Sequence, residues 1–213
     1  MSVLLITPSI LDSHKWLKEC PPSWHDKAKT DLLNALKRVY SPMNPATQRG
    51  VAFERAICSS FGNSREEFVA QFGEISAPFY DRCKGALQQV TYRKNITVNG
   101  EDFLLYGKAD IVHPDRIIDI KTTASWKGPY GYTSKNQHHV YIAASGITTF
   151  EYLVAVFEKD ATSLRPMTVE SVDASGSVEG SLIHVTKSIV DFMEYLKSAP
   201  EFEDAYRHKF NRW

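Results

Sequence analysis

Alternating apolar and polar positions in the middle of the chain predict three antiparallel strands in succession. Residues 92–98 and 103–112 follow a period of two, and Asn99-Gly100 between them supplies the two positive-φ positions that a tight hairpin needs. A third strand is expected over residues 117–122, after the turn residues His113-Pro114-Asp115-Arg116. The centre of the chain is therefore expected to form a β-meander.

Helical spacing flanks this meander on both sides. Thr7-Pro8-Ser9 supplies a capping hydroxyl and a first-turn proline, so a helix is expected to begin there and to end at Cys20-Pro21-Pro22. A second helix is expected over residues 23–40, and a third over 47–61, with an apolar stripe that includes Phe53 and Ile57. Further helices are expected within 64–90 and over 134–144, 182–196 and 201–210, with a buried strand over 149–158 and an edge strand over 167–172.

Composition narrows the class of protein without giving a function. A chain of 213 residues with 43% hydrophobic and 23% charged residues has the make-up of an ordinary soluble globular protein. Lys plus Arg and Asp plus Glu each number 25, so nucleic-acid binding would have to depend on a local basic patch. Three cysteines without CxxC spacing favour the reducing cytoplasm, and the sequence has neither a signal-peptide pattern nor a membrane-span pattern.

Asp119 and Lys121 stand on one face of the strand expected over 117–122. Because side chains alternate along a strand, Ile118 and Ile120 point the other way, and the two charged residues have Cα atoms roughly 7 Å apart. Asp110, near the end of the neighbouring strand, brings a second carboxylate to the same place. Converging carboxylates suit Mg²⁺, and a lysine can orient or help to deprotonate a metal-bound water for phosphodiester hydrolysis. The alternative is a solvated strand face with a cross-strand ion pair.

Two helices carry further polar candidates. Glu54 lies at the margin of the apolar stripe of the 47–61 helix, and Gly50, one turn earlier, clears space beside it. Glu54 is either a third acid that reaches the metal or a surface charge paired with a neighbouring arginine. On the 134–144 helix, Gln137 and Tyr141 lie four residues apart and share a face, where they form either site residues or a buried polar pair.

Aromatic and basic residues gather in the loop after Lys121. Unpaired bases can stack on aromatic rings while ammonium groups meet phosphates, and packing over the core is the alternative for the aromatic rings. The candidate DNA-binding residues, in this loop and beside the site, are Arg93, Lys94, Trp126, Lys127, Tyr130 and Lys135.

Four short fragments follow one another in a fixed order: Gly50-x-x-x-Glu54, Gly107-x-x-Asp110, Asp119-Ile120-Lys121 and Gln137-x-x-x-Tyr141. With the expected element order αβββαβ, they resemble the PD-(D/E)XK nuclease superfamily, and within it the RecB-like and phage lambda-type exonucleases. The resemblance covers about residues 47–157 and the opening Thr7-Pro8-Ser9-Ile10-Leu11.

This resemblance implies an α/β (α+β) fold with a restriction-endonuclease-like core, in which helices flank a central mixed sheet. A single domain would span residues 1–213. It would comprise an N-terminal helical segment (1–46), a catalytic core (47–158) and a C-terminal strand and helices (159–213).

A metal site is also implied by the resemblance. Asp110 and Asp119 would hold Mg²⁺ or Mn²⁺ together with the backbone carbonyl of Ile120, and Glu54 would support them from its helix. No cysteine follows Cys83, so the four-cysteine iron–sulfur cluster of some relatives is not expected.

The implied activity is that of a Mg²⁺-dependent deoxyribonuclease, an exonuclease of phage or prophage recombination or repair. Lys121 would position or activate the attacking water, while Gln137 and Tyr141 would steady the lysine and the scissile phosphate. Alternatives are a structure-specific endonuclease, an RNA substrate, and an inactive nucleic-acid-binding or assembly module on a nuclease fold. The implied partners are DNA, further copies of the chain, and a recombination or replication protein, with no membrane.

Overall fold

The computed structural model describes residues 3–39 and 42–212. Their strands are β1 (Val3–Ile6), β2 (Leu87–Val98), β3 (Glu101–Val112), β4 (Arg116–Thr123), β5 (Thr149–Val156), β6 (Thr168–Asp173) and β7 (Asn211–Arg212). Their α-helices are α1 (Pro8–Glu19), α2 (His25–Lys37), α3 (Pro45–Ser59), α4 (Arg65–Phe72), α5 (Ala77–Cys83), α6 (Tyr130–Thr133), α7 (Gln137–Ser145), α8 (Val178–Ser198) and α9 (Pro200–Phe210).

All seven strands belong to one mixed sheet, which divides along one edge of β3. The sheet order is β6-β5-β4-β3-β1-β7, and β2 pairs with the other edge of β3 over nearly its whole length. On the dividing edge, β1 runs parallel to β3 at Phe103–Leu105, whereas β4 runs antiparallel to it at Ile111 and Val112. Between these two pairings β1 and β4 separate, and the proposed site residues of β3 and β4 lie at this division.

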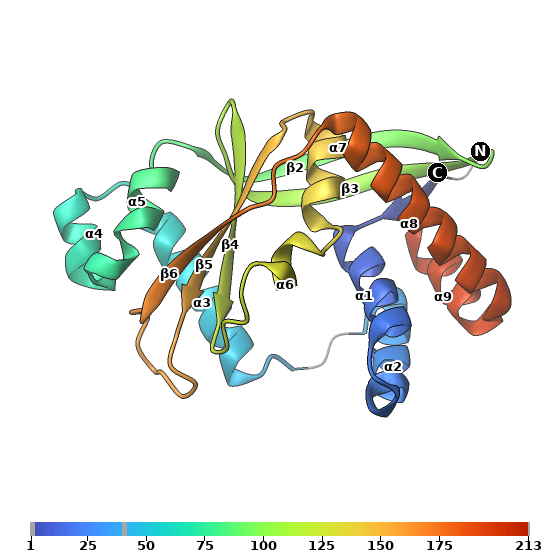
Figure 1. The fold of residues 1–213 in the computed structure, drawn as a ribbon, viewed down its shortest axis with the longest axis horizontal. Coiled ribbons are helices and arrows are strands. Elements are labelled where there is room, and N and C mark those ends of the chain that lie inside the picture. The colour runs from blue at the N-terminus through green and yellow to red at the C-terminus, as the bar shows by residue number, and fades with distance from the viewer. Residues whose placement is uncertain (1–2, 40–41, 213) are drawn as a thin grey trace.

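Helices cover both faces of the sheet (Figure 1). Helix α7 packs against β2, β3 and β5, and α3 packs against β4. Figure 1 also shows α4 and α5 gathered at one end of the molecule, with α1, α2, α8 and α9 at the other. No helix among residues 3–39 and 42–212 combines the length and the apolar character needed to cross a bilayer.

The alternation expected for β4 is confirmed by its packing. Ile118 and Ile120 belong to an apolar cluster with Phe53 and Ile57 of α3. Ile117, one position out of phase, belongs to a second cluster that includes Tyr141 of α7. The strand is therefore buried on both faces, and Asp119 and Lys121 share the phase of Ile117.

Local signals define the boundaries of the elements near the site. The Thr7 hydroxyl accepts a hydrogen bond from the Ile10 amide at 3.4 Å and caps α1, and Asn44 caps α3 through the Thr47 amide at 2.8 Å. The hairpin between β2 and β3 has φ values of 50° at Asn99 and 81° at Gly100, so the expected Asn-Gly turn is confirmed.

The element order α3-β2-β3-β4-α7-β5 matches the expected αβββαβ core, and the mixed sheet flanked by helices confirms the predicted fold class. The helical prediction for residues 64–90 is wrong at its end, because β2 begins at Leu87. Strand β1 was not expected. The second helix runs only from His25 to Lys37, where Arg38 takes a left-handed φ of 54°; Tyr40, its predicted end, lies outside the described residues.

Candidate active site

A buried carboxylate, Asp119, lies at the centre of the candidate site. Its side chain is 2% exposed, and its Oδ1 accepts a hydrogen bond from the Gln137 side-chain amide at 2.7 Å. Its Oδ2 forms an ion pair with the Lys121 ammonium at 2.6 Å, with no aligned hydrogen bond to any described residue. Strand β4 and helix α7 thus meet through one carboxylate that retains capacity for another ligand.

Asp110 faces this group from β3. Its Oδ2 accepts a hydrogen bond from the backbone amide of Ile120 at 2.9 Å, across the division of the sheet. The N–H and C=O groups of a strand residue point to the same side, so the Ile120 carbonyl is directed toward the same opening. Burial raises the pKa of the Asp110 carboxyl to about 7, and the charges of Asp119 and Glu54 contribute to this rise. The site therefore holds more negative charge than its one ammonium balances.

Gln89 links the remaining acid to this group. Its side-chain Nε2 donates to Glu54 Oε1 at 3.0 Å and to Asp110 Oδ1 at 3.3 Å. Gln89 was not predicted as a site residue, because it fell in a segment expected to be helical up to residue 90 and belongs to no sequence motif. Glu54 is consequently a member of the acidic group rather than a surface charge paired with an arginine.

The Lys121 ammonium is held in its charged form. Burial alone lowers its pKa, but the charges of Asp119, Asp110 and Glu54 outweigh that effect and leave the pKa above its ordinary value. Its side chain is 30% exposed, so it can still reach a molecule that enters the site. A charged lysine in this place can orient a water molecule or stabilise developing negative charge.

Tyr141 supports β3 rather than pointing freely into the site. Its hydroxyl donates to the Lys108 carbonyl at 2.8 Å, and its ring lies against Gly107. A Cβ atom at Gly107 would lie 2.2 Å from Tyr141 Cε1, so glycine is required for this approach. Tyr141 and Gln137 therefore hold β3 and β4 to the same helix on both sides of the division in the sheet.

Asn136, directly before α7, fixes the start of this helix. The residue is 1% exposed. Its backbone amide and its side-chain amide both donate to Asp12 Oδ1 of α1, at 2.7 and 3.0 Å. Its side-chain oxygen accepts a hydrogen bond from the Ser188 hydroxyl at 2.8 Å and lies 3.0 Å from His184 Nε2, and both of these residues belong to α8. The position of Gln137 therefore depends on a polar cluster that joins three helices.

The donor set suits a hard divalent cation by its chemistry. Carboxylates and a backbone carbonyl are the ligands that Mg²⁺ and Mn²⁺ prefer. Among residues 3–39 and 42–212, however, no three His, Cys, Asp or Glu side chains are arranged as a ready-made metal cluster. The reason is visible in the contacts, because Asp110 and Glu54 are turned toward amide donors and Asp119 toward Gln137 and Lys121. The incompletely bonded Oδ2 of Asp119 and the raised pKa of Asp110 indicate a site that would gain from added positive charge.

A cavity of about 370 Å³ opens beside these residues, between the start of α3 and the end of β4. Glu54, Ile120 and Lys121 line it. Gly50 brings the helix close to the strand, since a Cβ atom there would lie 2.6 Å from the Thr122 hydroxyl oxygen. The cavity gives a solvent-borne molecule a route to the acids.

The six residues predicted to bind DNA occupy different surroundings. Lys94 donates to the Ala143 carbonyl of α7 at 2.9 Å, so its ammonium takes part in packing. Trp126 stacks on Tyr132 with ring centroids 5.7 Å apart and contacts the core, as the alternative interpretation expected. Tyr130 is 78% exposed, Lys127 is exposed and Lys135 is half-buried.

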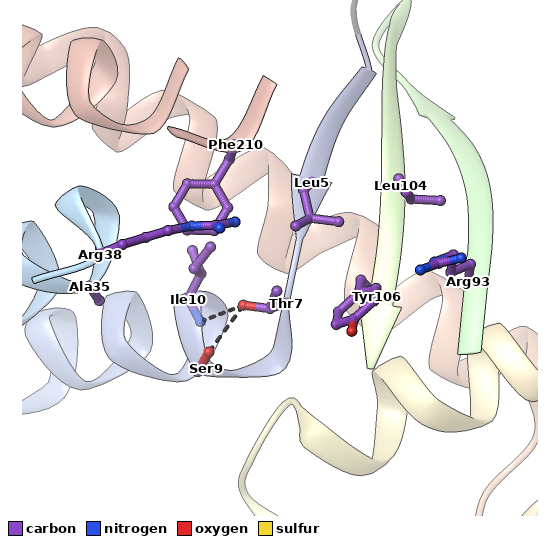
Figure 2. A pocket seen from close by; sticks show the side chains of 10 residues that line it. All are labelled: Leu5, Thr7, Ser9, Ile10, Ala35, Arg38, Arg93, Leu104, Tyr106 and Phe210. Atoms are coloured by element: carbon purple, nitrogen blue, oxygen red, sulfur yellow. Dashed lines mark hydrogen bonds between the residues drawn. The ribbon is translucent and has the colours of Figure 1, made fainter. Parts of the chain in front are cut away.

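Arg93, the sixth, lines a larger cavity of about 780 Å³ (Figure 2). Its guanidinium lies 5.7 Å from the centre of the Tyr106 ring, on the strand pair that leads to Asp110. Arg38, on the opposite wall in Figure 2, stacks at 4.5 Å on Phe210. This cavity combines two positive charges with aromatic rings.

Comparison with known proteins gives a fold relationship. No family model matches the chain, and no curated protein sequence matches it. Among solved structures, an alkaline exonuclease (LHK-Exo) in complex with dAMP matches with a TM-score of 0.50 and 14% identity, over 95% of this chain and 92% of that one. A second structure of this exonuclease, from Laribacter hongkongensis, matches with a TM-score of 0.49, and a protein described as SSO0001 matches with the same TM-score. At 14% identity, the match to the exonuclease structure with dAMP establishes a shared fold.

Proposed function

We propose that this protein is a metal-dependent nuclease that hydrolyses phosphodiester bonds in DNA, and that it acts as an exonuclease. The observation that carries the proposal is the buried Asp119, which is paired with Lys121 and held by Gln137 beside Asp110. An ion pair with a buried carboxylate, next to further carboxylates, is costly, and such arrangements concentrate at functional sites. The fold likeness to an alkaline exonuclease supports the choice of reaction.

The residues have distinct roles in the proposed site. Asp110, Asp119 and the Ile120 carbonyl would hold Mg²⁺ or Mn²⁺, with Glu54 at their side. When bound, the cation would supply Lewis acidity and lower the pKa of a coordinated water. Gln137 keeps Asp119 in place, which preserves the orientation of its second oxygen.

Lys121 would act on the reacting groups directly. Because its pKa is raised, it stays protonated near neutral pH and can donate hydrogen bonds. It would orient the attacking water and stabilise charge that develops on the phosphate oxygens. Its partial exposure toward the cavity of Glu54 and Ile120 supports this role.

The nucleic acid would approach over the strand pair β2–β3. Arg93 and Tyr106 line the larger cavity on the strands that continue to Asp110, where a guanidinium can meet phosphate and a ring can stack on a base. This arrangement supports DNA as substrate even though the whole chain carries no net charge.

Purified protein incubated with linear double-stranded DNA and with closed circular DNA tests the proposal. We expect Mg²⁺ to support loss of linear DNA while circles stay intact, and EDTA to stop the reaction. Nicked circles would indicate an endonuclease, and the same assay with labelled RNA tests the other substrate. Asp119→Asn, purified in the same way, serves as the inactive reference, so that equal cleavage by this variant would reveal a contaminating nuclease. Binding of DNA without cleavage by the unaltered protein would favour the binding-module alternative.

A further inference from the structure

Gln89 adopts a backbone conformation that its residue type disfavours. Its φ of 53° lies in the left-handed region, although it is part of strand β2. Its neighbours are regular, since Gln88 pairs with Ile111 and Val90 with Ala109 on β3. Strained backbone of this kind persists where the surrounding structure requires it, and it gathers at functional sites.

In this backbone conformation the Gln89 side chain reaches two acids. A primary amide has two N–H donors, and those of Gln89 reach Glu54 Oε1 and Asp110 Oδ1 at 3.0 and 3.3 Å. One amide therefore joins a carboxylate on α3 to a carboxylate on β3. Hydrogen bonds from an amide to ionised acceptors are stronger than those between neutral groups.

These are oxygens that the proposed metal site needs. Divalent cations bind carboxylate oxygens at about 2.0–2.6 Å, so an amide donor and a cation cannot share the same lone pairs. We propose that the Gln89 amide stands in for the cation: it satisfies Glu54 and Asp110 in the metal-free protein and is displaced when a divalent cation binds. This inference rests on the proposed function, because it concerns the same acids.

The placement of Glu54 does not depend on this amide. Helix α3 is fixed by Phe53 and Ile57, which are both fully buried against β4 and α5. Without the amide, Glu54 and Asp110 would still face each other, but as carboxylates that lack a donor. Removal of the amide therefore raises the free energy of the metal-free state more than that of the metal-bound state, and tightens cation binding.

Titration of the full-length protein with Mn²⁺ alone, by calorimetry, tests this inference. Gln89→Met keeps the length and volume of the side chain but removes its hydrogen bonds, and should bind Mn²⁺ about tenfold more tightly. Gln89→Glu, which also removes the donors, should shift in the same direction. Gln88→Met is the matched control, because the Gln88 side chain is exposed and its amide donates to the Cys58 carbonyl at 3.3 Å rather than to an acid of the site.

Unfolding temperatures provide the second measurement. In EDTA, Gln89→Met should unfold at a lower temperature than the unaltered protein, and saturating Mn²⁺ should remove most of that difference. The inference would be overturned if both Gln89 variants bound Mn²⁺ no more tightly than the unaltered protein. If the unaltered protein binds Mn²⁺ and Asp110→Asn does not, that result would leave the proposed function intact. Absence of Mn²⁺ binding by the unaltered protein would overturn both.

Discussion

The Gln137 side-chain amide donates to Asp119 Oδ1 at 2.7 Å and connects the first residue of helix α7 to the middle of strand β4. The two residues are separated by a loop and the short helix α6, so the contact is tertiary rather than local. It leaves Lys121 as the partner of the other carboxylate oxygen. The carboxylate is thereby fixed from two elements, one on each side.

Replacement of Gln137 by Ala should lower the cleavage rate about 10- to 100-fold, as expected when a partner that orients a metal ligand is lost. Binding of DNA in EDTA should change little. Gln137→Glu should be at least as harmful, because it places a second carboxylate against Asp119. Unaltered rates in Gln137→Ala would mean that Asp119 needs no support from α7.

Replacement of Lys121 by Ala should reduce cleavage about 10²- to 10⁴-fold, since the site would lose its charged donor. Fluorescence anisotropy in EDTA should show DNA binding close to that of the unaltered protein. Lys197→Ala is the matched control, because Lys197 is an exposed lysine on α8, outside the proposed site. Activity that survives in Lys121→Ala would remove the lysine from the mechanism.

Gly107→Ala should destabilise the protein by about 1–3 kcal/mol, the usual cost of forcing atoms into a packed core. The added methyl group would lie 2.2 Å from Tyr141 Cε1, so α7 has to move away from β3. Urea unfolding measures the loss. Gly62→Ala is the control, since a Cβ atom at Gly62 meets nothing within 4 Å and its φ is not positive. Equal stabilities for the two variants would contradict the close packing of Tyr141.

Acid should destabilise the protein through His138 and His139. Burial, with smaller effects of neighbouring histidines, lowers the pKa of His138 to about 4 and that of His139 to about 3. In the unfolded chain a histidine has a pKa of about 6.5, so the unfolded state binds protons first as the pH falls. The stability that the two neutral histidines contribute is therefore fully present above about pH 6.5 and is lost progressively as the pH falls toward 4.

Unfolding temperatures at pH 7.5 and pH 5 measure this loss. His139→Asn should have a smaller difference between the two pH values than the unaltered protein. His25→Gln should keep the full difference, because His25 is exposed. A pH profile that His139→Asn leaves unchanged would assign the acid sensitivity to other groups.

Local chemistry made much of the core predictable. The Asn99-Gly100 turn requires positive φ at both positions, and alternation alone placed Asp119 and Lys121 opposite Ile118 and Ile120. The shared face of Gln137 and Tyr141 follows from helical spacing. These features depend on neighbours within a few residues, which a sequence displays directly.

Long-range geometry explains what was missed. Val3–Ile6 is a run of four apolar residues whose periodicity does not separate strand from helix, and it becomes β1 only by pairing with β3, about 100 residues later. Gln89 gave no signal, because nothing in its residue type predicts a positive φ within a strand. The roles of the site residues toward a metal and DNA remain predictions.

The hydrogen bonds of Asn136 extend the region in which substitutions affect catalysis. Ser188 of α8 donates to Asn136, directly before α7, and Asp119 accepts from Gln137, the first residue of α7, so both constrain the same end of that helix. In a random-mutagenesis screen, loss-of-function alleles should therefore map to α1 and α8 as well as to the strands. Such alleles would reduce turnover without touching DNA or cation, and a second change that re-anchors the helix could suppress them.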